Sequence, residues 1–521
     1  MKAVTSKQMR RIEQIAIEEL GIPSILLMEN AAINIAKHCL RIINDKQNAK
    51  VLIVCGSGNN GGDGMALARH LYIKGIEVKI IFADDMNAVK GDAEKNLQIT
   101  KKLEIPIESI QNTDNNLYIK SVIETSDLTV DAMLGTGLDR NVDGNYKLLT
   151  EMINSYAKYI ISVDIPSGIH SDTGRVMGCA VNAAETVTLG YLKTGILLYP
   201  GAEYTGKVHV EDIGIPGALI DKVKTETNVL TAGEAIFLLP ARRQRSNKGD
   251  HGKALIFAGS NEMPGAAALA CSASYITGCG LVCACVLPNV AGVINNWQRE
   301  VITRNVPDAD GMYCKKSINN LTEEIKNASV LVVGPGIGRG PGVTEFVCEL
   351  ISIAEVPLVL DADALFAVSE NVNILKQKKA PCIITPHPGE MSRLLASRMT
   401  GFSVSDILDD IRGIAAKFSK EFNVVTLLKD AHTVIANPDG DFYINTTGNN
   451  ALSKAGTGDV LTGMIAGFIA QGSDVFTASV LGAYFHGKAG EAAALNMSHY
   501  GVTASDIINC IPVVMNECCK Q

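Results

Sequence analysis

Short apolar runs rich in β-branched residues recur along this chain, with helix-patterned segments between them. At residues 51–55 the run VLIVC stops at Gly56, and a helical pattern follows at residues 65–74. Such a run is typical of a parallel strand buried on both faces. Further strands are expected at residues 78–82, 128–131, 159–164, 186–189 and 207–210. Strands that alternate with helices predict a doubly wound α/β domain.

A second series of the same kind follows a weak boundary at residues 215–245. There Ile215-Pro-Gly217 breaks the pattern, and residues 242–248 form a basic, polar loop. Strands are then expected at residues 253–257, 330–333, 358–361, 382–385, 424–428 and 432–435. A chain of 521 residues is long enough for two or three domains. We predict two α/β domains, residues 1–220 and 230–521, each with its own ligand site.

The charge balance and the cysteines exclude several classes of protein. The 47 Lys and Arg against 55 Asp and Glu give a net charge of -8, so we expect no nucleic acid and no membrane as a partner. Hydrophobic residues at 47% exclude extensive disorder. The 13 cysteines form no CxxC pair, which argues against a zinc ribbon or a thioredoxin-like motif. They are typical of buried thiols in a reducing compartment.

Targeting and membrane signals are also missing from the sequence. The first 14 residues have no apolar core of the kind that a signal peptide needs. Residues 263–298 carry no charge, but Pro264, Gly265, Gly278, Gly280 and Pro288 interrupt them. A buried helix followed by a buried strand explains that stretch better than a membrane span. We expect a soluble, cytoplasmic protein, and helices on each domain that could pack against a copy predict a homo-oligomer.

Polar residues gather where three strands of the first half end. GSGNNGGDG at residues 56–64 adds Asn59, Asn60 and Asp63 to a Gly-rich turn before a helix, and such oxygens can hold a hard cation. Asp131 opens DAMLGTGL, while Asp164 and Ser167 lie in VDIPSG. Each aspartate alone could be a helix cap. Together they favour a ligand site, because ligands of open α/β sheets bind outside the carboxyl ends of the strands.

The second half has its strongest motif at residues 448–459, GNNALSKAGTGD, which leads into a helix at residues 460–470. A GTGD turn at a helix start offers backbone amides to a phosphate, and Asp459 could accept a proton from an attacking hydroxyl. Asp459 could instead be a cap. Upstream, TPHPGE holds His387 three residues before Glu390 between prolines. By contrast, we expect His251, His486 and His499 to be structural.

The N-terminal motifs, from AIEELGIPSILLMENAA through GSGNNGGDG and DAMLGTGL to SVDIPSG, resemble the NAD(P)H-hydrate epimerase family over residues 1–215. The resemblance implies interconversion of the two C6 epimers of hydrated NADH and NADPH (NADHX and NADPHX), with Asp164 as the catalytic acid/base on a Rossmann-like three-layer α/β/α domain. It implies a potassium ion on Asn60, Asp131 and Ser167. The substrate contacts that it implies, besides Asp164, are Asn59, Asn60, Gly61, Gly62, Asp63, Gly135, Thr136, Gly137, Leu138, Asp139, Arg140 and Asn141. Glu13-Gln14 departs from the family, at a place expected to be remote from the chemistry.

Residues 230–515 resemble the ribokinase-like superfamily through GTGD, and most of all its ADP- or ATP-dependent NAD(P)H-hydrate dehydratases, through GPGIGR, TPHPGE, LKDAHTVI and GTGDVLTGMIAG. The resemblance implies that a nucleotide phosphorylates the C6 hydroxyl of the S epimer and that phosphate then leaves. Asp459 is the implied catalytic base, Ala266, Gly338 and His387 the substrate contacts, and Glu390 a magnesium contact. The implied nucleotide contacts are Lys429, Asp430, Ala431, His432, Thr433, Asn449, Asn450, Ala451, Leu452, Ser453, Lys454, Ala455, Gly456, Thr457 and Gly458.

Some residues depart from that pattern, and some alternatives stay open. Asp430, Asn450, Lys454 and Ala455 replace the family's usual Gly, Pro, Thr and Gly, which touches affinity or nucleotide choice. The fused arrangement implies ADP, with ATP as the alternative. The C-terminal half could instead be a vitamin kinase, which shares a GTGD-type base. The N-terminal half could be a non-catalytic binding module.

Overall fold

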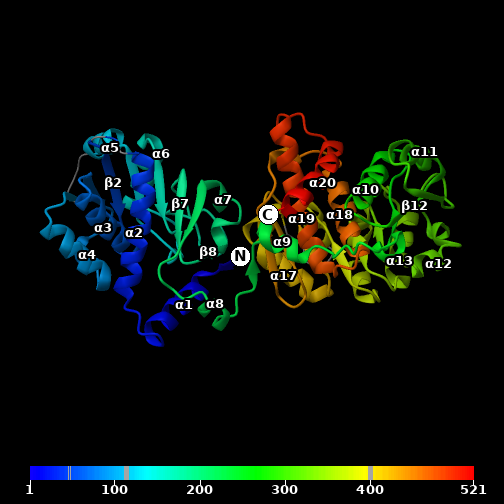
Figure 1. Ribbon diagram of the computed structural model, residues 1–521, viewed down its shortest axis with the longest axis horizontal. Helices are drawn as coiled ribbons and strands as arrows, with labels where there is room; N and C mark the ends of the chain where they lie inside the picture. The colour runs from blue at the N-terminus through cyan, green and yellow to red at the C-terminus, as the bar shows by residue number, and fades with distance from the viewer. Residues whose placement is uncertain (45, 47, 111–115, 397–402, 521) are drawn as a thin grey trace. The chain divides into compact units, whose positions relative to one another are not determined.

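The computed structural model describes residues 1–44, 46, 48–110, 116–396 and 403–520. The chain divides into two compact units, Lys2–Thr227 and Asn228–Gln521, with Met1 belonging to the second (Figure 1). Within the described residues, no helix is long and apolar enough to cross a membrane.

The N-terminal unit is built on a seven-stranded parallel sheet in the order β4-β3-β2-β5-β6-β7-β9. The strands are β2 (Lys50–Cys55), β3 (Glu77–Phe82), β4 (Ile107–Ser109), β5 (Leu128–Ala132), β6 (Ile160–Val163), β7 (Glu185–Leu189) and β9 (Lys207–Glu211). Two short strands, β1 (Lys2–Val4) and β8 (Leu192–Lys193), pair in parallel with each other. The strand order reverses between β2 and β5, and a crevice is expected at the carboxyl ends of these two strands.

Helices cover both faces of this sheet (Figure 1). Side chains of β2 point alternately into two hydrophobic cores. In the first core, Ile53 packs with α2 (Ser24–Ile43), α3 (Asn59–Ile73) and α4 (Gly91–Lys102). Leu52 and Val54 pack with α5 (Asn116–Thr125) and α6 (Gly144–Tyr156). The other helices of this unit are α1 (Ser6–Glu18) and the short helices α7 (Gly201–Tyr204) and α8 (Leu219–Lys222). Alternate side chains of a central strand point to opposite faces, so a strand buried on both faces reads as a continuous apolar run.

The C-terminal unit has a second, mostly parallel sheet. Its order is β13-β12-β11-β14-β15-β16-β17-β18-β19; neighbouring strands from β13 to β17 run parallel, and β18 pairs antiparallel with both β17 and β19. The strands are β11 (Lys253–Phe257), β12 (Leu281–Val286), β13 (Ile302–Asn305), β14 (Val330–Val333), β15 (Leu358–Leu360), β16 (Cys382–Ile384), β17 (Val425–Leu428), β18 (Thr433–Ala436) and β19 (Phe442–Asn445).

The helices of this unit pack in two groups. The first contains α10 (Pro264–Ile276), α18 (Thr457–Ala470), α19 (Val475–Asn496) and α20 (Ala504–Lys520). The second contains α13 (Pro341–Ile353), α14 (Asp363–Glu370) and α15 (Pro388–Ala396). The α/β fold class predicted from the sequence is confirmed for both halves. The uncharged stretch contains the expected helix and strand, α10 and β12, and then a second helix, α11 (Pro288–Trp297).

One predicted element starts earlier than expected. The sequence predicted a glycine turn followed by a helix at residues 65–74, whereas α3 begins at Asn59. Its glycines allow this, because a Cβ on Gly61 would lie 1.9 Å from the Gly56 carbonyl oxygen and one on Gly64 would lie 2.7 Å from Ala132 Cβ. The helix therefore packs directly on the strand ends through backbone, where any side chain would clash.

Candidate active sites

A cavity of about 640 Å³ opens at the carboxyl ends of β2, β5 and β6 in the N-terminal unit. Of the predicted residues, those that line it are Asn59, Asn60, Asp63, Asp164 and residues 135–141. Gly61 and Gly62 do not line it. A Cβ on Gly62 would lie 2.7 Å from Met28 Cε, so these two glycines serve helix packing.

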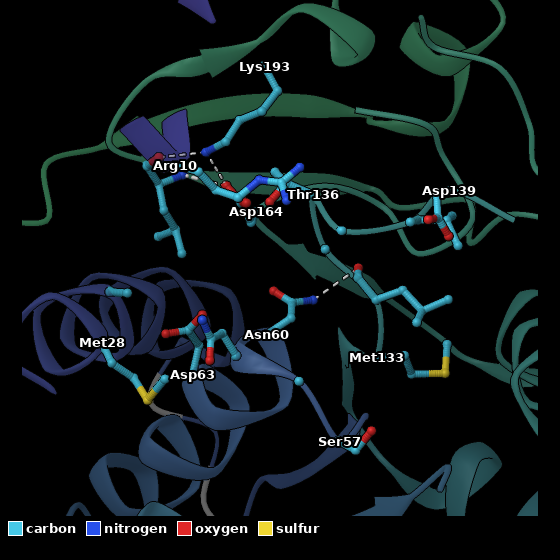
Figure 2. A pocket seen from close by; sticks show the side chains of 18 of the residues that line it. Arg10, Met28, Ser57, Asn60, Asp63, Met133, Thr136, Asp139, Asp164 and Lys193 are labelled. Carbon is cyan, nitrogen blue, oxygen red and sulfur yellow. Dashed lines mark hydrogen bonds and ion pairs between the residues drawn. The ribbon is translucent and has the colours of Figure 1, made fainter. Parts of the chain in front are cut away.

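Asp164 is held at the cavity wall by contacts with Leu189 and Lys193, which come later in the chain (Figure 2). It follows β6 with a φ of +65°, a conformation that L-residues rarely adopt. Its Oδ1 accepts a hydrogen bond from the Leu189 backbone N–H at 3.0 Å and forms an ion pair with Lys193 Nζ. Lys193 is only 1% exposed and also donates to the Leu189 carbonyl at 2.6 Å. Lys193 was not predicted from the sequence, because it lies on β8, which is too short to be recognised there.

Two other carboxyl groups of the cavity lining, those of Asp63 and Glu13, interact with Asp164. Burial raises the pKa of Asp63 well above its usual range, with added repulsion from Asp164 and Glu13. Burial, and then the charge of Asp164, also raises the pKa of Glu13. The expectation that Glu13 is remote from the chemistry was wrong, because α1 brings it into the cavity lining. Asp63, Glu13 and Asp164 lie close enough to repel one another, and Lys193 partly offsets this repulsion for Asp63 and Glu13.

Asp131, Ser167 and Asn60 meet beneath the cavity. Asp131 is fully buried and accepts hydrogen bonds from the Ser167 backbone N–H and the Ser162 hydroxyl, each at 2.8 Å. The Ser167 hydroxyl accepts from the Leu134 N–H at 2.8 Å, and the Asn60 amide donates to the Leu134 carbonyl at 3.1 Å. Figure 2 shows Asn60 turned toward that carbonyl. Burial raises the pKa of Asp131 despite these donors.

In the C-terminal unit, Asp459 lies in the first turn of α18. The helix starts after Gly456, whose φ of +90° turns the chain into it. Burial, and then repulsion from Asp361, raises the pKa of Asp459 to about 7, while Lys429 acts in the opposite direction. A carboxyl group that titrates near neutral pH can accept a proton from a substrate hydroxyl.

Lys429 is the central cation of this site. Its Nζ lies 3.0 Å from Asp361 Oδ1. Burial alone would lower the pKa of Lys429, but Asp361, Glu390 and Asp459 outweigh burial and raise it. Asp361 also accepts hydrogen bonds from the hydroxyls of Thr385 and Thr462, each at 2.7 Å. Asp361 was not among the predicted site residues, although it follows the apolar strand β15, much as Asp131 lies near the end of β5.

The remaining predicted substrate contacts lie on two loops and one helix start. Glu390 accepts a hydrogen bond from the His387 backbone N–H at 2.9 Å, which closes the TPHPGE turn. Burial lowers the pKa of His387 although Glu390 favours its charged form. The Gly338 N–H donates to Asp363 Oδ2 at 3.0 Å. Ala266 lies near this glycine-rich loop, because a Cβ on Gly336 would lie 2.9 Å from Ala266 Cβ.

The predicted nucleotide contacts fall on two segments, residues 429–433 between β17 and β18 and residues 449–458 before α18. The Lys429 N–H donates to the Pro386 carbonyl at 2.8 Å, which joins the first segment to the TPHPGE turn. Two departures from the family have partners in the α19–α20 connection: Asn450 pairs with His499, and Lys454 donates to the Tyr500 carbonyl. Burial raises the pKa of Asp430.

Two family models match the chain, one on each unit. The model described as NAD(P)H-hydrate dehydratase matches residues 254–513. The model described as YjeF-related protein N-terminus matches residues 24–195. Both units thus have the class of fold and site of a hydrated-cofactor repair enzyme.

Relatives over the whole length identify the particular family. The chain is 38% identical to the bifunctional NAD(P)H-hydrate repair enzyme of Moorella thermoacetica, covering 99% of this chain and 97% of the relative. It is 30% identical to that of Escherichia coli, covering 97% and 92%. A solved ADP/ATP-dependent NAD(P)H-hydrate dehydratase from Bacillus subtilis, co-crystallized with ATP/Mg2+, is 31% identical with a TM-score of 0.48, covering 56% of this chain and 98% of that one. The chain belongs to the bifunctional NAD(P)H-hydrate repair enzymes, with an epimerase and a dehydratase domain, which confirms the resemblance read from its motifs.

Proposed function

We propose that Asp164 is the acid/base of epimerisation at C6 of the hydrated nicotinamide ring and that Asp459 is the base of dehydration. The observation that carries both assignments is that each unit places a carboxylate near a lysine ammonium: Asp164 pairs with Lys193, and Lys429 acts against the burial of Asp459. Each lysine stabilises the ionised carboxylate, which is the form that accepts a proton.

In the epimerase cavity, Asn59, Asn60, Asp63 and residues 135–141 contact the hydrated dinucleotide. Asp63 and Glu13 have raised pKa values, so beside Asp164 their carboxyl groups hold a proton more readily than free carboxyl groups do. That arrangement supports proton transfer at the substrate from one carboxyl group while another stays ionised.

Asn60, Asp131 and Ser167 fit a potassium ion. Each of these three side chains can offer an oxygen atom as a ligand, and hard cations prefer oxygen ligands. Among the described residues, the hydrogen bonds to Asp131 come from hydroxyl and backbone N–H groups, and no cationic side chain is bound to its buried carboxylate. A potassium ion there would neutralise that charge and add a fixed positive charge beside the cavity.

In the dehydratase site, the nucleotide donates a phosphoryl group to the C6 hydroxyl of the S epimer of NADHX or NADPHX, and Asp459 accepts the hydroxyl proton. Phosphate then leaves with the oxygen and the ring double bond is restored. His387, Gly338 and Ala266 position the hydrated dinucleotide, while residues 429–433 and 449–458 bind ADP, with ATP as the alternative. Magnesium would accompany the nucleotide, and Glu390, whose Oε2 accepts the His387 N–H, would help to hold it.

The proposal is tested by the return of NADH absorbance from mixed R and S hydrates with potassium, magnesium and either ADP or ATP. We expect full recovery of both epimers with ADP. Recovery that stops at the S share, beyond slow spontaneous epimerisation, would reduce the N-terminal half to a binding module. A stable phosphorylated product on a vitamin alcohol, with no recovery of NADH, would assign the C-terminal half to a kinase.

Potassium is tested separately by replacing it with sodium or with a bulky organic cation at constant ionic strength. We expect use of the R epimer to fall while dehydration of pure S epimer continues. Asn60→Leu should abolish the difference between the salts, and no response to potassium in the native protein would refute the assignment.

A further inference from the structure

Two histidines and a glutamate meet on the N-terminal unit away from the cavity. They are His38 on α2, Glu185 at the start of β7 and His209 on the edge strand β9. One ligand atom from each residue lies within 4.8 Å of the other two. The two imidazole rings are 4.4 Å apart between centroids. Glu185 is the first residue of β7, whereas the cavity lies at the other end of that strand, where Leu189 contacts Asp164.

His38 has a ring nitrogen that the protein leaves without a partner. Its Nε2 lies 2.8 Å from Glu211 Oε1, while its Nδ1 is buried without a hydrogen-bond partner. A buried polar nitrogen without a partner costs free energy. The arrangement is also that of a metal-binding histidine, in which a carboxylate orients the ring through one nitrogen and the other nitrogen binds the ion.

The side chains of Glu185 and His209 are held by hydrogen bonds and ion pairs, but both could bind an ion. His209 Nε2 lies 2.8 Å from Glu185 Oε2, and the Tyr159 hydroxyl donates to Glu185 Oε1 at 2.7 Å. Arg41 also pairs with Glu185, and its side chain is 52% exposed and can turn into solvent.

We propose that His38, His209 and Glu185 bind a divalent metal ion of the zinc class, at a site separate from the catalytic cavity. Two imidazoles and one carboxylate are a common ligand set for zinc, which binds nitrogen and oxygen at about 2.0–2.2 Å. Small side-chain rotations would close the three ligands around the ion. Because the ligands come from α2, β7 and β9, the ion would join a covering helix to the edge of the sheet.

The test is a zinc titration of the full chain, stripped with EDTA and then exchanged into a buffer with a thiol-free phosphine reductant and excess potassium and magnesium. Excess potassium and magnesium occupy the catalytic sites, so that they do not compete for zinc. We expect one equivalent of zinc to bind and to raise the melting temperature. His38→Asn and His209→Asn should each abolish that binding, and Glu211→Gln should weaken it by about 10- to 100-fold.

His70→Asn is the matched control. His70 lies 2.9 Å from Glu29, and Arg69 pairs with the same carboxylate, which repeats the His–Glu–Arg contacts with a single imidazole. We expect this variant to bind zinc as the native protein does. Cobalt bound at the site should give weak visible bands without the intense thiolate charge-transfer band that a cysteine site gives.

Three results would overturn the proposal: no saturable zinc binding by the native chain, unchanged binding by both histidine variants, or a thiolate band with cobalt. If the histidine variants do not fold, as judged by circular dichroism, Glu211→Gln decides, because Glu211 is partly exposed and its loss leaves the core intact. Binding by that variant equal to the native protein would then reject the site.

Discussion

Asp459 lies in surroundings that oppose its charge. Burial and Asp361 raise its pKa from 3.8 to about 7. An acid with a raised folded-state pKa binds more protons when folded than when unfolded, so the stability of the fold falls as pH rises between these two values. The group that is suited to accept a proton in the reaction therefore destabilises the folded chain when it is ionised.

Asp459→Asn should separate these two effects. At about 1.4 kcal/mol per pKa unit, ionised Asp459 costs up to about 4 kcal/mol at pH 8. We expect the variant to melt at a higher temperature than the native protein at pH 8, to match it at pH 4, and to lose dehydration by about 100-fold or more. Thermal melts at the two pH values and the S-epimer assay check this. Equal melting temperatures at pH 8 would show that the charge is not destabilising.

Glu13 gives a prediction for the epimerase cavity. Its charge raises the pKa of Asp63, after burial and Asp164. Glu13→Gln removes this like charge, so the pKa of Asp63 should fall and the acid limb of the epimerisation pH profile should move to lower pH. Rates measured on R epimer between pH 5 and pH 9 check this, with dehydration of S epimer as the control. An unmoved profile would place Glu13 outside the proton chemistry.

The sequence identified some of these residues and missed others for a physical reason. Asp131 and Asp164 stand out because an aspartate closing an apolar strand is locally unusual. Lys193 and Glu13 carry no local signal, since only the β1–β8 pair and α1 bring them to Asp164. Asp361 did have the strand-end signal, and the same rule applied there would have found it.

At the scale of elements, the start of α3 depends on backbone contact. A Cβ on Gly61 would lie 1.9 Å from the Gly56 carbonyl oxygen, and backbone cannot yield as a flexible side chain can. Gly61→Ala should therefore displace the first turn of α3, destabilise the fold by about 1–3 kcal/mol and reduce epimerisation.

Gly217→Ala is the control for that change, because nothing lies within 4 Å of its Cβ position and its φ is ordinary. Urea unfolding of both variants makes the comparison. Equal midpoints would mean that α3 tolerates a side chain at Gly61, and the close packing would then not explain the glycine.

Strands differed in how well the sequence predicted them. Strands buried on both faces, such as β2 and β14, are continuous apolar runs and were found. The strands β4 and β13 are short and partly exposed, with polar residues in most positions, and were not found. Their pairing comes from neighbouring strands, and their own sequence does not specify it.

At the scale of the whole molecule, two family models on one chain correspond to two units with separate candidate sites. The α/β class followed from the alternation of strands and helices. The proposed catalytic residues of each unit come from that unit alone, so each activity should survive loss of the other.

Mixing two variants tests this independence. Asp164→Ala alone should recover only the S share of NADH, and Asp459→Asn alone should recover none. Their equimolar mixture should recover both epimers, because the epimer formed by one protein diffuses to the other. NADH absorbance follows all three reactions. A mixture that stops at the S share would show that substrate must pass between the sites of one chain.

The early start of α3 also has a thermodynamic consequence for binding. Asn60 and Asp63 stand on a helical turn whose backbone is already fixed by contact with the end of β2, so ordering a loop is not part of binding there. Immobilising backbone costs about 1–2 kcal/mol per residue, and a site on a flexible glycine loop would lose that amount on every encounter. This side of the cavity is therefore preorganised, and the entropy lost on binding comes mainly from the ligand and from side chains.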